Sequence, residues 1–281
     1  MANVCPYGRF THAIVRGIPE SFGQRADGGE SVSVDVAKAQ RQFGVLTGAL
    51  RQKVGLQLIE IPADPELPES WRIEDIAVIQ GDTALITRPF KQQRRAEADA
   101  VRRVMNELNL TVVEMGVEEG GSGGATLEGS DVLFTGREFF VGISKHTNHR
   151  GAEVLADTFR VSETFRPAFR PDLLNRRWSG GKKKLSEEST LSSDNCPQLT
   201  DHHYDVLSVS EDVASNCVYV RGPAKVDYLL HPTADECPNS ITAFQKLPDY
   251  TLLPTACSEA SKLGGALSSF CLLINRKPNY S

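Results

Sequence analysis

Long apolar segments are absent from this sequence of 281 residues. No run approaches the roughly 18 consecutive apolar residues that a membrane-spanning helix needs. The first residues also lack the apolar region of a secretory signal. We therefore expect a protein without a membrane span that resides in the cytoplasm.

Motifs for metals and nucleotides are also missing. The sequence has no HExxH pair, which excludes zinc proteases of that type, and neither GxGxxG nor GxxxxGKS/T, which bind dinucleotides and phosphates. Its six cysteines form no CxxC pair and show no zinc spacing, so free thiols are expected rather than disulfides. The sequence predicts no metal and no cofactor.

Charge of one sign is not in strong excess. The net charge is −5, with 24% charged and 40% hydrophobic residues, which is ordinary for a globular protein. A net negative charge argues against nucleic acid as a partner, although the basic stretch RRWSGGKKK leaves a nucleic-acid or localisation patch as a weaker alternative. We expect a small-molecule substrate; the oligomeric state stays open.

A repeated hairpin pattern is the main positive signal. In residues 73–89, IEDIAVIQGDTALITRP, the acids Glu74 and Asp75 precede an apolar run, a Gly81-Asp82 turn and a second run. Apolar runs joined by a short Gly-containing turn are typical of a β-hairpin. Acids directly before a buried strand lie at its mouth, where charge can face a cleft. An isolated acid there is more often a turn-capping residue.

The same pattern recurs along the chain, which strengthens the functional interpretation. In residues 125–153, Glu128 and Asp131 precede two apolar runs joined at Gly136-Arg137. A looser copy occupies residues 216–232, and part of another lies at 270–275. Repeats of about 50 residues suggest a propeller-like ring. In such a ring the equivalent strand ends converge, so the acids would gather around one pocket.

Helical segments separate the hairpins. Apolar residues at spacings of three and four predict helices at 34–54, 94–108 and 151–159. Ser33 is the expected cap at the start of the first helix, and Gly55 is expected to end it. Each unit therefore consists of a hairpin, a helix and a strand, which predicts a mixed α/β protein.

Residues 161–199 depart from the pattern. This segment has no sustained apolar period; its first half is basic and its second half is rich in serine. Such composition is typical of a loop or of disorder. Because the flanking segments keep the repeat, we hypothesise that altered splicing or a frameshift replaced native sequence here. We expect the segment to be aberrant or disordered.

Cys271 is the candidate nucleophile. It lies in GGALSSFCLLIN, at the start of the last apolar run, and Cys257 is the rival thiol. A cysteine in an apolar strand is usually a small buried hydrophobic residue, but a base or cation that lowers its pKa makes it a nucleophile. Acids and a thiol together favour a cleft for a cation beside a nucleophile.

The hairpins and the last strand resemble a known family. IEDIAVIQGDTALITRP, ATLEGSDVLFTGREFFVGISKHTNHRGAEVLADTF and LSSFCLLINRKP are similar to the dimethylarginine dimethylaminohydrolases, and more to the second vertebrate paralogue than to the first. The resemblance implies a pentein fold, a five-unit α/β propeller, as a single domain over residues 1–281 interrupted by 161–199. It also implies hydrolysis of asymmetric dimethylarginine or monomethylarginine to citrulline and a methylamine, which favours nitric oxide synthesis.

The resemblance also implies roles for individual residues. Glu74 and Asp75 match the pair that binds the substrate, and Glu69 falls where the family has another acid. Arg94 matches an arginine that holds the substrate's α-carboxylate. The family's catalytic residues match Glu128, an acid that orients a histidine, and Cys271, the nucleophile. Carboxylates suit this substrate because a guanidinium is a permanent planar cation.

Three departures from the family leave an alternative open. The family's general acid and base is a histidine between the third and fourth units, whereas this sequence has none between His149 and His202. Cys271 also follows two extra residues relative to the first paralogue, and His146 stands where that paralogue has a second substrate arginine. The alternative is a catalytically impaired relative that binds a ligand or a protein as a regulator.

Overall fold

The structure is a computed structural model that describes residues 8–25, 30–116, 124–136, 138–159, 168–169 and 207–275. Twelve strands are named in it. They are β1 (His12–Arg16), β2 (Gln57–Ile61), β3 (Ala77–Gln80), β4 (Thr83–Ile86), β5 (Thr111–Glu114), β6 (Val132–Phe134), β7 (Phe139–Val141), β8 (Ala168–Phe169), β9 (Val218–Arg221), β10 (Asp227–His231), β11 (Thr251–Pro254) and β12 (Cys271–Ile274).

The helices are short apart from three. They are α1 (Val36–Gly48), α2 (Ala98–Glu107), α3 (His149–Phe159), α5 (Ile241–Phe244) and α6 (Ser258–Lys262). Single 3₁₀ turns precede four strands and one helix: η2 (Ile73–Ile76), η3 (Gln92–Glu97), η4 (Gly129–Asp131), η5 (Asp212–Ser215) and η6 (Leu267–Phe270). The 3₁₀ turns before β3, β6 and β12 carry or adjoin the candidate site residues.

The strands form four three-stranded sheets in the described part of the chain, ordered β12-β1-β2, β3-β4-β5, β6-β7-β8 and β11-β10-β9. In each sheet an antiparallel pair is joined by a third strand that runs parallel to its neighbour. A parallel neighbour requires a crossover, which the intervening helix supplies. The predicted unit of hairpin, helix and strand is therefore confirmed.

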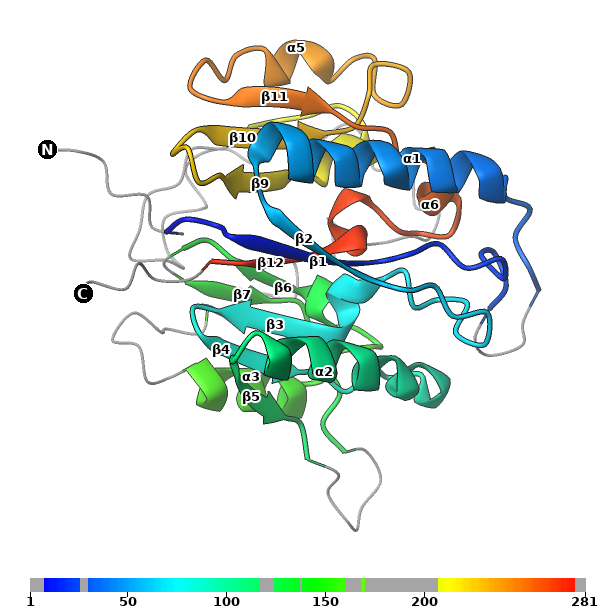
Figure 1. Cartoon of the computed structure of the whole chain (residues 1–281), viewed down its shortest axis with the longest axis vertical. Coiled ribbons are helices and arrows are strands. Elements are labelled where there is room, and N and C mark those ends of the chain that lie inside the picture. Colours follow the sequence, from blue (N-terminus) through cyan, green and yellow to red (C-terminus); the bar gives the residue numbers. More distant parts are fainter. Residues whose placement is uncertain are drawn as a thin grey trace, which may run out of the picture.

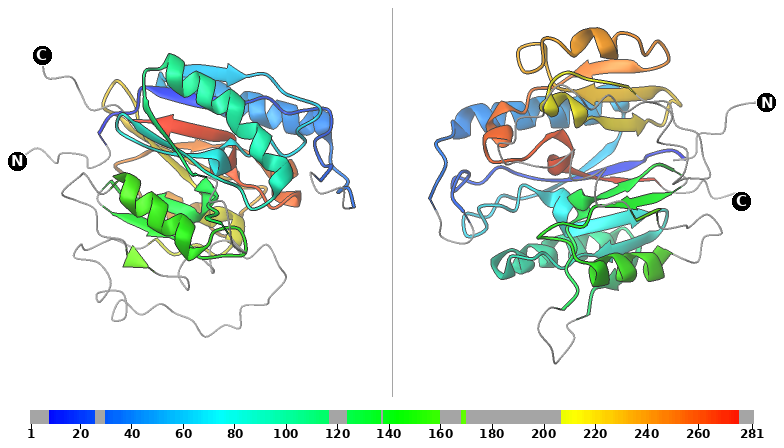
Figure 2. Two further views of the ribbon diagram at one scale, coloured as in Figure 1. Left: turned by 90° about the horizontal axis from the view of Figure 1, so that it is seen from below. Right: turned by 180° about the vertical axis from the view of Figure 1, so that it is seen from behind.

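The first sheet joins the two ends of the described chain. Strand β1 pairs with β12, placing Val15 opposite Cys271, and with β2 on its other side. Strand β12 also packs beside β3, where its Leu272 and Ile274 share a core with Ile76 and Ala77. Figure 1 shows β12 lying between the sheets, and Figure 2 shows α2 and α3 at the periphery.

The expected helices are present with shifted starts. Helix α1 begins later than predicted: Asp35, not Ser33, is its cap, because the Asp35 side chain accepts a hydrogen bond from Lys38 N at 2.8 Å. The helix continues as a π-helix, Ala49–Val54, and ends as predicted at Gly55, whose φ is 83°. The segment 94–108 begins as the 3₁₀ helix η3 before it becomes α2.

The prediction for residues 161–199 lies outside the described residues, with one exception. Strand β8 is placed there and pairs in parallel with β7, so these two residues form a regular strand rather than a loop.

Candidate active site

The mouths of β3 and β6 lie directly against each other. Glu74 and Asp75 are in η2, and Gly129 in η4 packs so closely that a Cβ there would lie 2.1 Å from the Glu74 carbonyl oxygen. Only a residue without a side chain fits this contact. The acids of the two predicted repeats, Glu74 and Asp75 in one and Glu128 and Asp131 in the other, therefore share one region of the molecule.

Asp75 is held by arginine rather than left open. Its Oδ2 lies 2.6 Å from Arg94 Nη1, and both side chains are almost completely buried. Burial alone would raise the pKa of Asp75, but the charges of Arg94 and Arg72 lower it below its usual value. Thr87 Oγ1 also donates to the Asp75 carbonyl oxygen at 2.6 Å. Asp75 is thus a charged, fixed carboxylate.

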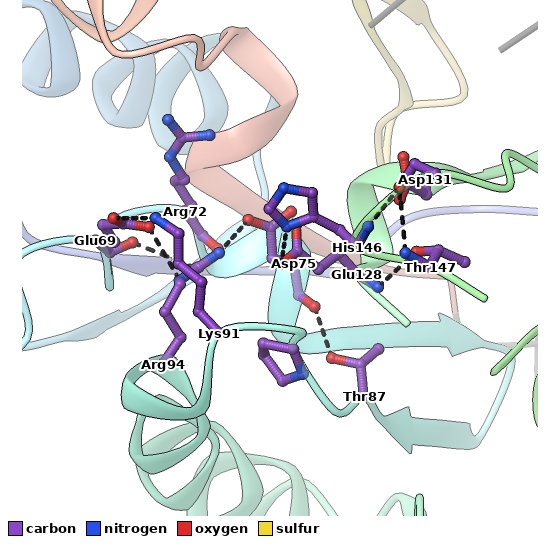
Figure 3. Close-up of polar contacts among 12 residues, drawn as sticks. Glu69, Arg72, Asp75, Thr87, Lys91, Arg94, Glu128, Asp131, His146 and Thr147 are labelled. Atoms are coloured by element: carbon purple, nitrogen blue, oxygen red, sulfur yellow. Dashed lines mark hydrogen bonds and ion pairs between the residues drawn. The ribbon is translucent and has the colours of Figure 1, made fainter. Parts of the chain in front are cut away.

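Arg94 contacts two further acids. Its Nη2 lies 2.8 Å from Glu97 Oε2, and its Nε lies 3.6 Å from Glu69 Oε2. Burial would lower the pKa of Arg94, but the charges of Asp75 and Glu97 raise it overall. Figure 3 shows Arg94 beside Glu69. A substrate carboxylate at Arg94 would have to displace one of them, so the expected role of Arg94 stays a prediction.

Glu69 has a second cationic partner. Lys91 Nζ lies 2.7 Å from Glu69 Oε1, and Figure 3 shows both beside Arg94. Glu69 therefore joins the ion-pair cluster around Arg94. Its expected contact with a substrate is not tested by this arrangement and remains a prediction.

Glu128 contacts His146, which is not the family's histidine between the third and fourth units, so the role that the resemblance implies for Glu128 stays a prediction. Glu128 Oε1 lies 3.0 Å from His146 Nδ1, as Figure 3 shows. The backbone N–H of Glu128 donates to Thr147 Oγ1 at 3.0 Å, and Thr147 is fully buried. Sequence reasoning had placed His146 only in the position of a substrate arginine. The polar loop SKHTNHRG after the hairpin was the available signal.

Asp131 fixes the same loop from the other side. Ser144 Oγ donates to Asp131 Oδ2 at 2.8 Å. Burial raises the pKa of Asp131, and the neighbouring charges of Glu128 and Asp75 add to the rise. Asp131 therefore acts as a structural acceptor for the loop that carries His146.

Glu74 is connected to the last strand through a serine. Ser268 Oγ donates to Glu74 Oε2 at 2.8 Å. Asn216 holds that serine with two hydrogen bonds, Asn216 Nδ2 to Ser268 Oγ at 2.8 Å and Ser268 N to Asn216 Oδ1 at 3.0 Å. Sequence reasoning missed Asn216 and Ser268, because their contact depends on the third and last repeats lying side by side.

Cys271 lies at the start of β12 and lines a cavity of about 260 Å³ together with Glu74, Gly129 and Ser268. Burial, with the charge of Glu74, raises the pKa of its thiol to about 12. The thiol is therefore protonated in this state. Two residues earlier, Ser269 Oγ accepts a hydrogen bond from Ala266 N at 3.1 Å.

The rival thiol lies elsewhere. Cys257 precedes α6, and it is absent from the residues that line the cavity. Burial raises the pKa of its thiol to about 12, and the charge of Glu236 adds to the rise. The structure therefore favours Cys271 over Cys257 as the thiol beside the acids.

The described residues also bear on metal binding and on membrane insertion. No group of three or more histidine, cysteine, aspartate or glutamate side chains is placed to hold a metal ion there. In the same part of the chain, no helix is both long and apolar enough to cross a membrane. Among the cysteines that the structure describes, Cys237, Cys257 and Cys271 are free thiols.

Comparison with known proteins identifies the relatives of this site. The DDAH2 proteins of Homo sapiens and Bos taurus are each 46% identical to the chain, and each alignment covers 97% of both proteins. The chain belongs to the dimethylarginine dimethylaminohydrolase family. Its relative in Pseudomonas aeruginosa, named N(G),N(G)-dimethylarginine dimethylaminohydrolase, is 24% identical over 94% of this chain and 99% of its own length. No family model matches the chain.

Solved structures confirm the fold expected of a dimethylarginine dimethylaminohydrolase. The Pseudomonas aeruginosa enzyme, solved as a cysteine-to-serine mutant complexed with citrulline, has a TM-score of 0.74 at 22% identity and covers 95% of this chain and 100% of its own. The N-terminal domain of ArgZ, an arginine dihydrolase from cyanobacteria, has a TM-score of 0.65 at 16% identity and covers 94% and 98% of the two chains. The fold is the pentein fold.

Proposed function

We propose that this protein hydrolyses asymmetric dimethylarginine or monomethylarginine to citrulline and a methylamine. The observation that carries the proposal is the convergence of Glu74, Asp75 and Glu128 beside the cavity that Cys271 lines. The sequence relationship to the DDAH2 proteins supports the same reaction.

The substrate's charge explains why the site is acidic. A methylated guanidinium is a planar cation with N–H donors, and carboxylates bind such a group through charge-assisted hydrogen bonds. Glu74 borders the cavity, and its side-chain oxygen is already an acceptor for Ser268. Glu128 supplies further negative charge, whereas the charge of Asp75 is compensated by Arg94, so Glu74 and Glu128 favour a cation over an anion.

The thiol supplies the covalent step. The Cys271 sulfur forms a bond to the central guanidinium carbon, and the C–N bond to the methylated nitrogen breaks as that nitrogen leaves with a proton. Water then bonds to the same carbon, the C–S bond breaks, and citrulline is released with the thiol restored. This route divides one difficult hydrolysis into two easier displacements.

The cation itself offsets the unfavourable ionisation of the thiol. Burial and Glu74 raise the pKa of Cys271 to about 12 in the unliganded protein. A bound guanidinium would neutralise Glu74 and place a positive charge near the sulfur, which lowers the thiol's pKa. The thiolate would then form only when substrate is present.

A second function is favoured by one observation. If the raised pKa of Cys271 persists when the ligand binds, the same acids would hold a methylated arginine without cleaving it. The protein would then act as a ligand- or partner-binding relative of the family.

Citrulline release from asymmetric dimethylarginine by the purified protein tests the proposal. Turnover is expected for the wild type and for Cys257→Ser, and its loss is expected in Cys271→Ser. A folded wild-type protein that binds the substrate in calorimetry and releases no citrulline would support the binding function instead.

The setting of the reaction is also proposed. Free thiols at Cys237, Cys257 and Cys271 are typical of a reducing compartment, which agrees with a cytoplasmic enzyme. Removal of methylated arginines there would favour nitric oxide synthesis. Nitrite accumulation by cells expressing the wild type, compared with cells expressing Cys271→Ser, measures this effect.

A further inference from the structure

We infer that His146 carries the proton in this reaction, giving it to the departing amine and then taking one from the attacking water, with Glu128 as its positioning residue. The inference rests on the proposed hydrolysis. In the family, the general acid and base is a histidine between the third and fourth units, and this sequence has no histidine between His149 and His202. The inference gives that role to His146.

The hydrogen bond to Glu128 sets the chemistry of the imidazole. A carboxylate oxygen only accepts hydrogen bonds, so the 3.0 Å contact places a proton on His146 Nδ1. Nε2 is then the nitrogen that can take and release a proton. The Glu128 side chain is 9% exposed and that of His146 is 24% exposed. The carboxylate is therefore buried, while part of the imidazole ring is accessible.

The backbone around His146 is fixed by hydrogen bonds. Ser144 Oγ accepts from His146 N at 3.0 Å and from Thr147 N at 3.2 Å while it donates to Asp131. Ser144 N in turn donates to the Thr147 carbonyl oxygen at 3.0 Å. A general acid needs such a defined position, because proton transfer requires hydrogen-bond distance to the reacting atom.

The pair adjoins the cavity that contains the thiol. Glu128 directly precedes Gly129, which lines that cavity with Glu74 and Cys271 and packs against the backbone of Glu74. The edge of the His146 ring faces Phe90, with ring centroids 5.7 Å apart, and Phe90 is 52% exposed. The His146 ring therefore lies between the buried Glu128 and the exposed Phe90.

The proton count closes over one turnover. Protonated His146 gives its Nε2 proton to the methylated nitrogen as the C–N bond breaks, and the neutral amine departs. The ring then takes one proton from water as the hydroxide oxygen bonds to the carbon. The Cys271 thiol gives its proton to solvent when the substrate binds. When the C–S bond breaks, the proton left on the oxygen passes to sulfur, so citrulline is released and the thiol is restored. His146 ends the cycle protonated, as it began.

Steady-state citrulline release by His146→Ala tests the assignment. Loss of general acid–base help lowers kcat by roughly 10²–10⁴-fold, and we expect a loss in this range with little change in KM. His149→Ala is the matched control, since His149 is exposed three residues along the same segment. Imidazole added to His146→Ala is expected to restore part of the turnover, which also shows that the variant is folded. Glu128→Gln is expected to lower kcat less than His146→Ala.

The outcomes separate this inference from the proposed function. A His146→Ala protein with wild-type kcat, or with a raised KM and unchanged kcat, overturns the role of His146 and leaves the hydrolase function standing. A wild-type protein without turnover overturns both. Partial rescue by imidazole, absent with the larger 2,4,5-trimethylimidazole, is the result that supports a proton carrier at this position.

Discussion

Arg94 Nη1 and Asp75 Oδ2 lie 2.6 Å apart, in side chains that are 2% and 5% exposed. This ion pair joins the turn before β3 to the turn before α2, and it fixes Asp75 next to Glu74, which lines the cavity. A buried pair contributes little net stability by itself, but removing one partner leaves an uncompensated charge. The pair thus couples the fold to the site.

Asp75→Asn is expected to lower the free energy of unfolding by about 3 kcal/mol, the low end for a broken buried pair, because Glu97 still contacts Arg94. Urea unfolding measures this. The folded state lowers the pKa of Asp75, so the contribution is present above the unfolded pKa of about 3.9. It is lost as the pH falls through the folded pKa, and the difference between variant and wild type should shrink there.

Asp82→Asn is the control for this prediction. Asp82 is exposed in the β3–β4 turn, and a surface substitution of this kind changes stability by about 0.5 kcal/mol or less. Equal effects of the two substitutions would mean that the Asp75–Arg94 pair does not hold the turn.

Gly129→Ala is expected to destabilise the protein by at least about 1–3 kcal/mol, the usual cost of overpacking. The added methyl carbon would lie 2.1 Å from the Glu74 carbonyl oxygen and 2.7 Å from that of Ala77. Because both contacts are with backbone, η2 or η4 must move, and citrulline release should fall as well. Thermal unfolding and turnover measure the two effects.

Gly44→Ala is the matched control, because the same substitution is expected to stabilise the protein at this position. Gly44 lies inside α1, and a Cβ there would meet nothing within 4 Å. Alanine in a helix interior is favoured over glycine by roughly 1 kcal/mol, so this variant should be more stable than the wild type. A stable Gly129→Ala protein would show that the packing of η4 on η2 is loose.

The alkylation rate of Cys271 by iodoacetamide should rise roughly tenfold per pH unit through the neutral and mildly alkaline range, because the thiolate is the reacting form. The raised pKa of about 12 places the plateau above this range. Glu74→Gln removes a charge that raises the pKa, so it should increase the rate at any one pH. Mass spectrometry of the peptide that contains Cys271 resolves this thiol from the others.

Glu66→Gln serves as the control for alkylation, since Glu66 is an exposed acid of the loop before η2. It should leave the rate unchanged. A wild-type rate that levels off near neutral pH would mean that the thiol is already ionised without substrate, contrary to the buried environment described above.

The local patterns of the sequence predicted much of the fold. Glycine at Gly81 and Gly136 marked both hairpin turns, and in the structure these residues have φ values of 61° and 83°. The 3.6-residue period of apolar residues located the helices. It did not locate their first residues, because these depend on the hydrogen bonds of the capping side chains. Asp35 replaced Ser33 as the cap because its carboxylate reaches Lys38 N.

The candidate site could be predicted only where its residues were close in sequence. The repeated pattern of acids before strands identified the pairs Glu74–Asp75 and Glu128–Asp131. The contacts that decide their behaviour are long-range: Ser268 reaches Glu74 across 194 positions, and Arg94 reaches Asp75 across 19. A local sequence period gives no information about such partners. The ion pairs between Arg94 and the surrounding carboxylates could therefore not be predicted from the sequence.

The pairing of β1 with β12 has a consequence for synthesis. Thr11 and Ile274, joined by a hydrogen bond, are 263 positions apart. The first sheet therefore stays incomplete until the ribosome has released β12, and the same strand brings Cys271 to the acids. Folding of this sheet and assembly of the active centre are thus one late event, and a nascent chain stalled before β12 would have neither.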